Sequence, residues 1–312
     1  MEPTVAALGG DSAGDVAKRL FLATRPRFFT ASVLPVVVGT AAGAKGAGSL
    51  DGTAFALALA SVVCVHAAVN VFNDVFDARS GADQANAERI HPFTGGSRFI
   101  QNGVMSENEM AMLAFALLGV GGLLGAVLFV LKGAAVLLFG AIGIALGILY
   151  SMPPVQLAGR GLGEIAVGIG FGVLPVVGGA WLQAGALSAQ ALLLSLPLGC
   201  WITAVLIANE VPDADADRRA GKRTLVARLE SGGIKAFYLA VQAAALFALG
   251  IGVWMDRLPA WGLVVPVLLV AAAGVVAAGL NGPRAALVRA IKLTLAIHLA
   301  GGLWLCLLAV AA

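Results

Sequence analysis

Two clusters of carboxylate and amide side chains stand at the ends of long apolar segments, and they are the residues best suited to chemistry. In the first cluster Asn70, Asp74 and Asp77 are spaced i, i+4 and i+7. In a helix this spacing places the three side chains on one face. Ionisable groups at the edge of a membrane segment are costly to keep there, so they indicate function. Asn73 and Asp83 extend the cluster along the chain.

The second cluster repeats the pattern about 140 residues later in the chain. Asn209, Asp213 and Asp217 follow the spacing i, i+4 and i+8, which again gives a shared helical face. Pro212 cannot donate a backbone hydrogen bond, so it is expected to end or kink the preceding helix. Glu210 lies off the shared face, and a solvated loop position is an equally good interpretation of it.

The composition of the chain indicates that these clusters belong to a membrane protein. The chain has 312 residues, of which 60% are hydrophobic and 12% are charged, about half the charged share of a soluble domain. Continuous apolar runs favour helices over a barrel, whose strands alternate in polarity. We therefore expect an all-α integral membrane protein, with residues 1–312 forming a single transmembrane domain of nine spans. The expected spans are residues 28–45, 54–76, 110–131, 134–150, 162–183, 189–210, 236–255, 259–280 and 291–312.

The distribution of basic residues predicts the orientation of this bundle in the cell (inner) membrane. With the N-terminus in the cytoplasm, only Lys45, Lys132 and Arg257 of the 20 Lys and Arg residues fall on the opposite side, where the C-terminus also lies. The net charge of +3 is thus a sign of topology and gives no support for nucleic-acid binding. Residues 1–24 lack a signal-peptide pattern and are expected as a cytoplasmic lead-in, either a short interfacial helix or a disordered stretch.

The two clusters emerge on the same side because an even number of spans separates them. Were the two helices neighbours, five aspartates would converge and would repel one another unless neutralised. Mg²⁺ accepts such hard oxygen ligands, and it takes phosphate oxygens of a substrate as further ligands. The repeated spacing disfavours the alternative of solvated loop carboxylates. The sequence thus predicts a Mg²⁺ cofactor and a diphosphate substrate, with Asp74, Asp77, Asp83, Asp213 and Asp217 converging.

Two basic residues are candidates for holding that diphosphate. Residues 91–103 form a glycine-rich stretch whose backbone N–H groups, together with Arg98, could bind phosphate oxygens. Lys222, just after the second cluster, could balance the charge of a leaving diphosphate. A plain loop is the alternative in both places, and we favour the phosphate-binding interpretation.

Other polar residues keep two interpretations each. His66 lies four residues before Asn70 and extends the same stripe, as either a cavity residue or a packed side chain. Arg27 and Arg160 are either substrate contacts or residues that reach to lipid headgroups. Glu164 would be costly inside a span without a partner, and Arg160 is a plausible one.

At these residues the chain resembles the UbiA superfamily of intramembrane prenyltransferases, over nearly its whole length. Residues 70–83 and 209–224 are the most specific parts of the resemblance. Within the superfamily they are similar to the 1,4-dihydroxy-2-naphthoate polyprenyltransferases of menaquinone synthesis, as are residues 25–27, 150–154 and 160–164. Asp83 falls later than the third aspartate of the 4-hydroxybenzoate-type pattern, so its own metal role stays open.

The resemblance implies nine helices around a central cavity, cytoplasmic caps that bear the aspartate motifs, and a lateral opening for an isoprenoid tail. The implied partners are a polyprenyl diphosphate, an aromatic acceptor and the lipid bilayer. Carried over residue by residue, Asn70, Asp74 and Asp77 would hold one Mg²⁺ and Asp213 with Asp217 a second, Lys222 and Arg98 would contact the diphosphate, and Asn73 and Asn209 would assist in binding substrate.

The implied reaction is Mg²⁺-dependent loss of diphosphate from a polyprenyl diphosphate, followed by attack of an electron-rich ring carbon on the allylic cation. Tyr150 is either an aromatic neighbour of that cation or an interfacial belt tyrosine. The expected acceptor is 1,4-dihydroxy-2-naphthoate; 4-hydroxybenzoate, a tetrapyrrole or a glycerol-phosphate lipid stay open, and the oligomeric state is not predicted. A cation-coupled transporter is the rival of another class, but transporters place such sites near the bilayer midplane.

Overall fold

Helices coincide with all of the apolar runs that the sequence marks as spans. The computed structural model describes residues 2–86 and 88–311, which form helices and loops with no strand among them. Eight helical stretches are long and apolar enough to cross a membrane, which confirms the all-α membrane fold. The helix at the fourth expected span has 17 residues and is shorter, so a count of nine spans stays a prediction. At the expected spans other than the fifth, the helices are α3 (Thr30–Ala47), α4 (Gly52–Ser80), α6 (Glu107–Lys132), α7 (Ala135–Ser151), α10 (Ala189–Glu210), α13 (Ser231–Trp254), α14 (Val264–Gly279) and α15 (Arg284–Ala311).

The fifth expected span is built from three consecutive helical pieces. α8 (Gly163–Val167) leads through the π-helical turn η3 (Gly168–Val173) into α9 (Leu174–Ala184). π-helical turns are rare and often lie at functional sites. Here the turn packs against α10, where a Cβ on Gly172 would lie 2.3 Å from the Cα of Gly199. The absence of side chains at these two glycines lets the two backbones touch.

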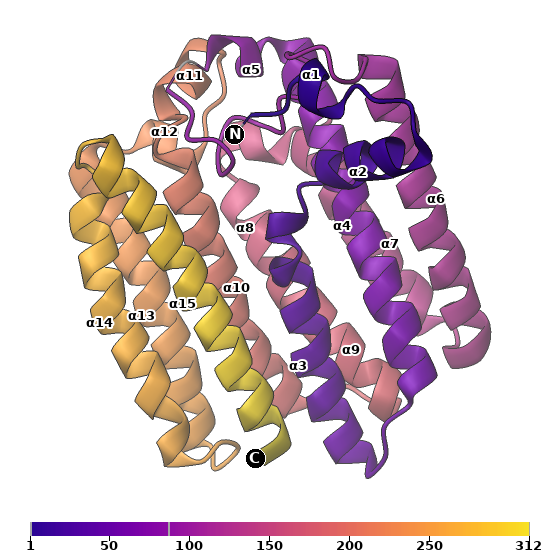
Figure 1. Cartoon of the computed structure of the whole chain (residues 1–312). Coiled ribbons are helices and arrows are strands. Elements are labelled where there is room, and N and C mark those ends of the chain that lie inside the picture. The colour runs from indigo at the N-terminus through magenta and orange to yellow at the C-terminus, as the bar shows by residue number, and fades with distance from the viewer. Residues whose placement is uncertain (1, 87, 312) are drawn as a thin grey trace.

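Both acidic motifs lie at one end of the bundle. Figure 1 shows the long helices side by side, with short helices gathered at the upper end and the end of α15 at the lower one. The loops that follow α4 and α10 meet at that upper end. The short helices there are α1 (Val5–Leu8), α5 (Ala82–Ala85), α11 (Ala214–Arg219) and α12 (Leu225–Arg228).

The residues at which α4 and α10 end place the two motifs at the upper end of the bundle. α4 begins at the N-cap Asp51, whose side chain accepts a hydrogen bond from the Ala54 N–H, and it ends at Gly81 with φ 77°. Glycine adopts this left-handed conformation without steric cost, so the chain turns directly after the carboxylates of the last helical turns. α10 ends at Glu210, two residues before Pro212. The expectation that this proline ends the helix is confirmed.

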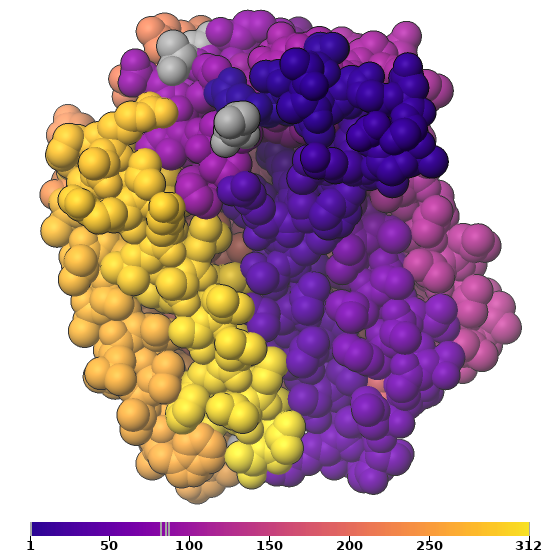
Figure 2. Space-filling view, viewed as in Figure 1, coloured from indigo at the N-terminus to yellow at the C-terminus, as the bar shows by residue number. Residues whose placement is uncertain are grey.

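The N-terminal segment folds over the same end of the molecule. α2 (Ala13–Ala23) starts at the N-cap Ser12 and lies across the ends of the long helices, as the indigo helix in Figure 1 and the indigo atoms in Figure 2 show. Phe21 and Leu22 on α2 are exposed. Of the two interpretations of this segment, the structure has the helix; its contact with a membrane interface stays a prediction.

Candidate active site

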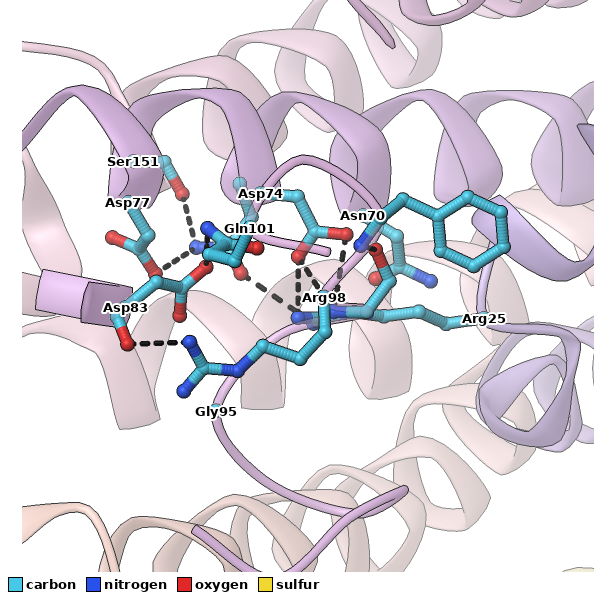
Figure 3. A network of polar contacts seen from close by, with 12 residues as sticks. Arg25, Asn70, Asp74, Asp77, Asp83, Gly95, Arg98, Gln101 and Ser151 are labelled. Carbon is cyan, nitrogen blue, oxygen red and sulfur yellow. Dashed lines mark hydrogen bonds and ion pairs between the residues drawn. The ribbon is translucent and has the colours of Figure 1, made fainter. Parts of the chain in front are cut away.

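Asp74 is the most enclosed carboxylate of the first motif. It is 2% exposed, and its Oδ1 lies 2.5 Å from Nη2 of Arg25. The Ser97 N–H donates to both of its carboxylate oxygens, at 3.2 and 3.3 Å (Figure 3). Charge-assisted bonds of this kind are the strong ones. Asp74 thus ties α4 to the turn before α3 and to the 91–103 loop.

The neighbouring amides hold the rest of this face in place. Asn73 Nδ2 donates to Asp77 Oδ2 at 3.1 Å and to Ser151 Oγ, at the end of α7, at 3.0 Å. Asn70 Nδ2 donates to the backbone oxygen of Thr24 at 3.0 Å. Asn73 therefore ties Asp77 to the end of α7, and Asn70 ties α4 to the end of α2. Figure 3 shows Ser151 beside Asp77 and Asn70 farther along the same helix.

Lys222 joins the second motif to the first. Its Nζ lies 2.5 Å from Asp77 Oδ1 and 4.0 Å from Asp217 Oδ1. Burial by itself would lower the pKa of this ammonium group, but the charges of Asp77 and Asp217 outweigh burial and raise the pKa. Lys222 is therefore a fixed positive charge between the two aspartate motifs.

Asp213 approaches the first motif through the 81–103 region. Its Oδ1 accepts from Nδ2 of Asn86 at 2.7 Å, and its Oδ2 accepts from the Gly95 N–H at 3.1 Å. Burial raises the pKa of Asp213, although these hydrogen bonds act in the opposite direction. The 91–103 loop thus contacts both motifs, through the Gly95 N–H to Asp213 and the Ser97 N–H to Asp74.

Asp83 completes the acidic group on the first side. It is 4% exposed, and its Oδ2 accepts from Nε2 of Gln101 at 3.0 Å. Burial, with the negative charges of Asp74 and Asp77, raises its pKa to about 7. Burial likewise raises the pKa of Asp217 to about 6. Both carboxyl groups therefore release their protons less readily than carboxyl groups in water do.

A cavity of about 690 Å³ runs from these side chains into the bundle. Its deep part is lined by apolar side chains and glycines of α3, α4, α6, α7 and α9, down to Leu128, Val136 and Leu182. A polar mouth and an apolar interior suit a molecule with a charged head and a hydrocarbon tail. Of the residues singled out in the sequence, His66, Asn70, Asn73, Asp77, Asp83, Tyr150, Asn209, Asp213, Asp217 and Lys222 line this cavity.

Four of the sequence candidates lie away from the cavity lining. Asp74 stands behind it, paired as described above. Arg98 is buried with φ 67°, and its guanidinium donates to the backbone oxygens of Asp83 at 2.5 Å and Asn86 at 3.0 Å. These bonds shape the loop, so contact between Arg98 and a diphosphate stays a prediction. Arg27 and Arg160 are exposed, and contact with substrate stays a prediction for them as well.

Glu164 has a partner other than the expected one. Its Oε1 accepts from the Leu225 N–H at 3.1 Å, whereas Arg160 donates to the backbone oxygen of Pro154 at 2.7 Å. Arg160 was the wrong choice because it precedes α8 and turns outward. Glu164 instead fixes the start of α12, next to the segment that carries Lys222.

Sequence reasoning missed several residues that shape the site. Arg25 had no role of its own in the sequence analysis, yet its backbone is left-handed with φ 57° and its side chain pairs with Asp74. Asn86 has no helical spacing that could have marked it. Glu210 lines the cavity and is 8% exposed, although its place off the helical face suggested a loop residue.

The donor set at the mouth fits a hard cation. Among the described residues, no three carboxylate, histidine or cysteine side chains are close enough together to hold a metal ion by themselves. Two buried amide oxygens without a hydrogen-bond partner among the described residues nevertheless line the cavity there, Asn86 Oδ1 and Asn209 Oδ1. Oxygen donors with part of the coordination supplied by a substrate phosphate are what Mg²⁺ favours.

Comparison with known proteins agrees with this geometry. The model of the UbiA prenyltransferase family matches residues 32–290. The chain is 32% identical over 262 residues to the 1,4-dihydroxy-2-naphthoate octaprenyltransferase of Mycobacterium tuberculosis, a match that covers 83% of this chain and 86% of that protein. It is 30% identical over 206 residues to the Bacillus subtilis protein of the same name, covering 66% of this chain and 64% of that protein, which is less than two thirds of the latter.

The fold is also that of a solved structure. A UbiA homologue from Archaeoglobus fulgidus, bound to GPP and Mg²⁺, matches with a TM-score of 0.63 and 16% sequence identity, over 94% of this chain and 100% of that one. At this level of identity the similarity establishes the fold.

Proposed function

The chain belongs to the UbiA prenyltransferase family, and from this premise we propose that it transfers a polyprenyl group from a polyprenyl diphosphate to 1,4-dihydroxy-2-naphthoate in menaquinone biosynthesis. The family and the class of enzyme expected from the sequence are thereby confirmed. The acceptor, the tail and the metal belong to the proposal. Family membership favours a transferase over a cation-coupled transporter.

One observation carries the proposal: two aspartate motifs, linked by Lys222, stand at the mouth of a cavity whose interior is apolar. A prenyl diphosphate has the matching distribution of charge and hydrocarbon. Its diphosphate would lie at the mouth and its tail in the interior. The deep wall includes Gly122 and Gly140, where an added Cβ would have no atom within 4 Å, so there is open space beside them.

The oxygen donors at the mouth would hold Mg²⁺. Asn70, Asp74 and Asp77 would form one site and Asp213 with Asp217 the other, with the role of Asp83 to be decided by substitution. Bound Mg²⁺ would offset the negative charge that develops on the leaving diphosphate. Burial, with the negative charges of neighbouring aspartates as a smaller contribution, raises the pKa values of Asp83 and Asp217 in the protein alone, and a bound cation would lower them again.

The protein's own residues would direct the bond exchange. The C–O bond of the prenyl diphosphate breaks and its electron pair leaves with the diphosphate, next to the ammonium of Lys222. A carbon of the acceptor ring would form the new C–C bond and then lose its proton to an oxygen of the released diphosphate. The apolar interior keeps water from the allylic cation, and Tyr150 on the cavity wall offers it an aromatic face.

The acceptor and the cellular setting rest on further arguments. The names of the Mycobacterium and Bacillus relatives support a naphthoate acceptor. The excess of Lys and Arg at the aspartate end supports a cytoplasmic mouth in the inner membrane, with the end of α15 on the opposite side. We further propose that residues 1–312 act as one transmembrane domain.

A competition among acceptors tests the proposal. Purified protein would be incubated with geranylgeranyl diphosphate, Mg²⁺ and an equimolar mixture of 1,4-dihydroxy-2-naphthoate, 4-hydroxybenzoate and a glycerol-phosphate lipid, and the products identified by mass spectrometry. We expect the prenylated naphthoate. If another compound were the only one prenylated, that compound would be the acceptor in place of the naphthoate. The absence of any prenylated product would contradict the proposed transferase activity.

A further inference from the structure

A polar pair lies one helical turn deeper in the cavity than the diphosphate site. His66 precedes Asn70 by four residues, which is about 6 Å along the axis of α4. It is 5% exposed and lines the cavity. Its Nδ1 lies 2.7 Å from Oγ of Ser32, a residue of α3 that is 0% exposed. A polar pair in this otherwise apolar part of the wall is costly and calls for a reason.

Aromatic rings hold His66 in one orientation. The ring of Phe171, from the π-helical turn η3, lies edge-on with its centroid 4.5 Å from that of His66, and the ring of Phe29 lies at 5.5 Å. With Ser32 on Nδ1, these contacts leave the ring little freedom to turn. The position of the other ring nitrogen, Nε2, is therefore set by the fold.

The hydrogen bond with Ser32 determines which nitrogen carries the proton. In the described part of the chain, His66 is the partner found for the Ser32 side chain. If Nδ1–H donated to Oγ, the hydroxyl proton of Ser32 would be left without an acceptor in a fully buried place, at a considerable cost. The hydroxyl therefore donates to Nδ1, and the neutral imidazole carries its proton on Nε2.

We propose that Nε2–H of His66 donates a hydrogen bond to a ring hydroxyl oxygen of the aromatic acceptor, with Ser32 fixing the proton on that nitrogen. This inference rests on the proposed function, because it needs an acceptor in the cavity. Nε2 has no acceptor among the described protein atoms, and His66 lies on the cavity wall. A ring held there would lie between the diphosphate mouth and the deep apolar part, beside the reacting end of the prenyl chain.

The position of His66 assigns the two substrates to different walls of the cavity. His66, Ser32 and Phe171 come from α4, α3 and η3, whereas the open glycines Gly122 and Gly140 belong to α6 and α7. The first wall offers a hydrogen bond and aromatic edges, which suit a ring with hydroxyl groups. The second wall offers space without polar groups, which suits a hydrocarbon tail.

The test separates the Michaelis constants of the two substrates. Steady-state kinetics with geranylgeranyl diphosphate and 1,4-dihydroxy-2-naphthoate would be measured for the purified full-length protein and for His66→Phe, His66→Gln and Ser32→Ala. We expect His66→Phe to raise KM for the acceptor about tenfold, the size of one hydrogen bond, with KM for the diphosphate unchanged. His66→Gln keeps an N–H donor and is expected to lose less, and Ser32→Ala is expected to raise the acceptor KM a few-fold.

Matched controls lie outside the cavity. His298 is 1% exposed and Ser195 is 0% exposed, and neither lines the cavity. His298→Phe and Ser195→Ala should leave the acceptor KM unchanged. A purely structural role for His66 would instead lower the unfolding temperature and leave the acceptor KM of the folded fraction unchanged, which would overturn the proposal.

A second measurement tests the proposal even if a His66 variant does not fold, because its decisive outcome is measured in the wild-type protein. The inhibition constants of 1-hydroxy-2-naphthoate and 4-hydroxy-2-naphthoate, each lacking one ring hydroxyl, would be compared in the wild-type protein and in His66→Gln. We expect one of the two to bind the wild type about tenfold more weakly than the other, with this difference reduced in His66→Gln. Equal constants in the wild type would overturn the proposal. Failure of the wild type to prenylate any aromatic acceptor would overturn the proposed function instead, so the two failures are distinguishable.

Discussion

Lys222 Nζ and Asp77 Oδ1 lie 2.5 Å apart, although 145 residues separate them in the chain. Their side chains are 15% and 17% exposed, so the pair is largely screened from water. It links the end of α4 to the segment after α11. This contact brings the two aspartate motifs together at the mouth of the cavity.

We expect Lys222→Met to lower kcat and to raise KM for the prenyl diphosphate. A hydrogen bond to a charged group contributes about 1.5–3 kcal/mol, which corresponds to about a 10- to 100-fold loss in kcat/KM. Lys132 offers a matched control, because its Nζ lies 2.8 Å from Asp51 Oδ2 at the opposite end of the bundle. Lys132→Met should leave both constants near the wild-type values, and equal effects of the two substitutions would contradict a special role for Lys222.

We expect Gly96→Ala to impair turnover far more than Gly103→Ala. Both glycines have positive φ, 77° and 67°, so each alanine brings backbone strain of about 1–2 kcal/mol. A Cβ on Gly96 would also lie 2.8 Å from Oδ2 of Asp83 and 3.1 Å from Oδ1 of Asp74, whereas one on Gly103 meets nothing within 4 Å. Both variants should unfold at lower temperatures than the wild type, Gly96→Ala at the lower of the two, and only Gly96→Ala should lose most of its activity at a temperature where both are folded. Similar activity in both variants would show that the loop does not set the position of these carboxylates.

We expect the affinity for Mg²⁺ to rise between pH 5.5 and pH 7.5. The pKa values of Asp217 and Asp83 are raised from 3.8 to about 6 and about 7, so the two groups release their protons across that range, and at its acidic end Mg²⁺ must displace those protons. Each displaced proton adds up to about a tenfold change in affinity per pH unit.

The sign for stability without Mg²⁺ is the opposite. A carboxyl group with a raised pKa holds its proton more tightly in the folded state, so the free energy of unfolding should fall as the pH rises toward 7. Unfolding temperatures with and without Mg²⁺ would measure both trends. Asp83→Asn should flatten the profile near pH 7, and a profile unchanged by that substitution would exclude Asp83 as its source.

We expect Asp74→Asn to abolish turnover while the protein still folds. The substitution leaves Arg25 without its charged partner, in a place where the Arg25 side chain is 20% exposed and that of Asp74 is 3% exposed. Loss of turnover is the expected result, in a protein that still unfolds cooperatively but at a temperature several degrees below that of the wild type, because Arg25 loses its charged partner. Near-normal turnover would remove Asp74 from the metal site.

Helical spacing made half of this site predictable. Asn70, Asp74 and Asp77 repeat at helical intervals, and the helix that bears them is specified by a continuous apolar run, so both could be inferred from local sequence. Because an even number of spans separates the two motifs, the second motif was then placed on the same side of the membrane as the first. These inferences succeed because they depend on periodicity and on the membrane, both of which act locally along the chain.

The remaining contacts come from loops and have no period. Arg25 reaches Asp74 only because its backbone is left-handed, and Asn86 meets Asp213 across 127 residues. Arg98 shows the converse: a cation next to glycines suggested a phosphate contact, but backbone carbonyl groups nearby accept its hydrogen bonds. Such pairings depend on where loops fold back, and no local pattern marks them.

The central claim is that both aspartate motifs form one diphosphate site, and a double-mutant cycle of ligand binding tests it most directly. The dissociation constant of an unreactive thiolodiphosphate analogue of geranylgeranyl diphosphate would be measured with Mg²⁺ for the wild type, Asp77→Asn, Asp213→Asn and the double variant. We expect each single substitution to weaken binding at least tenfold, and the double variant to lose less than the sum of the two free energies, because the groups share one ligand. Binding unchanged in either single variant, or fully additive losses, would contradict the account.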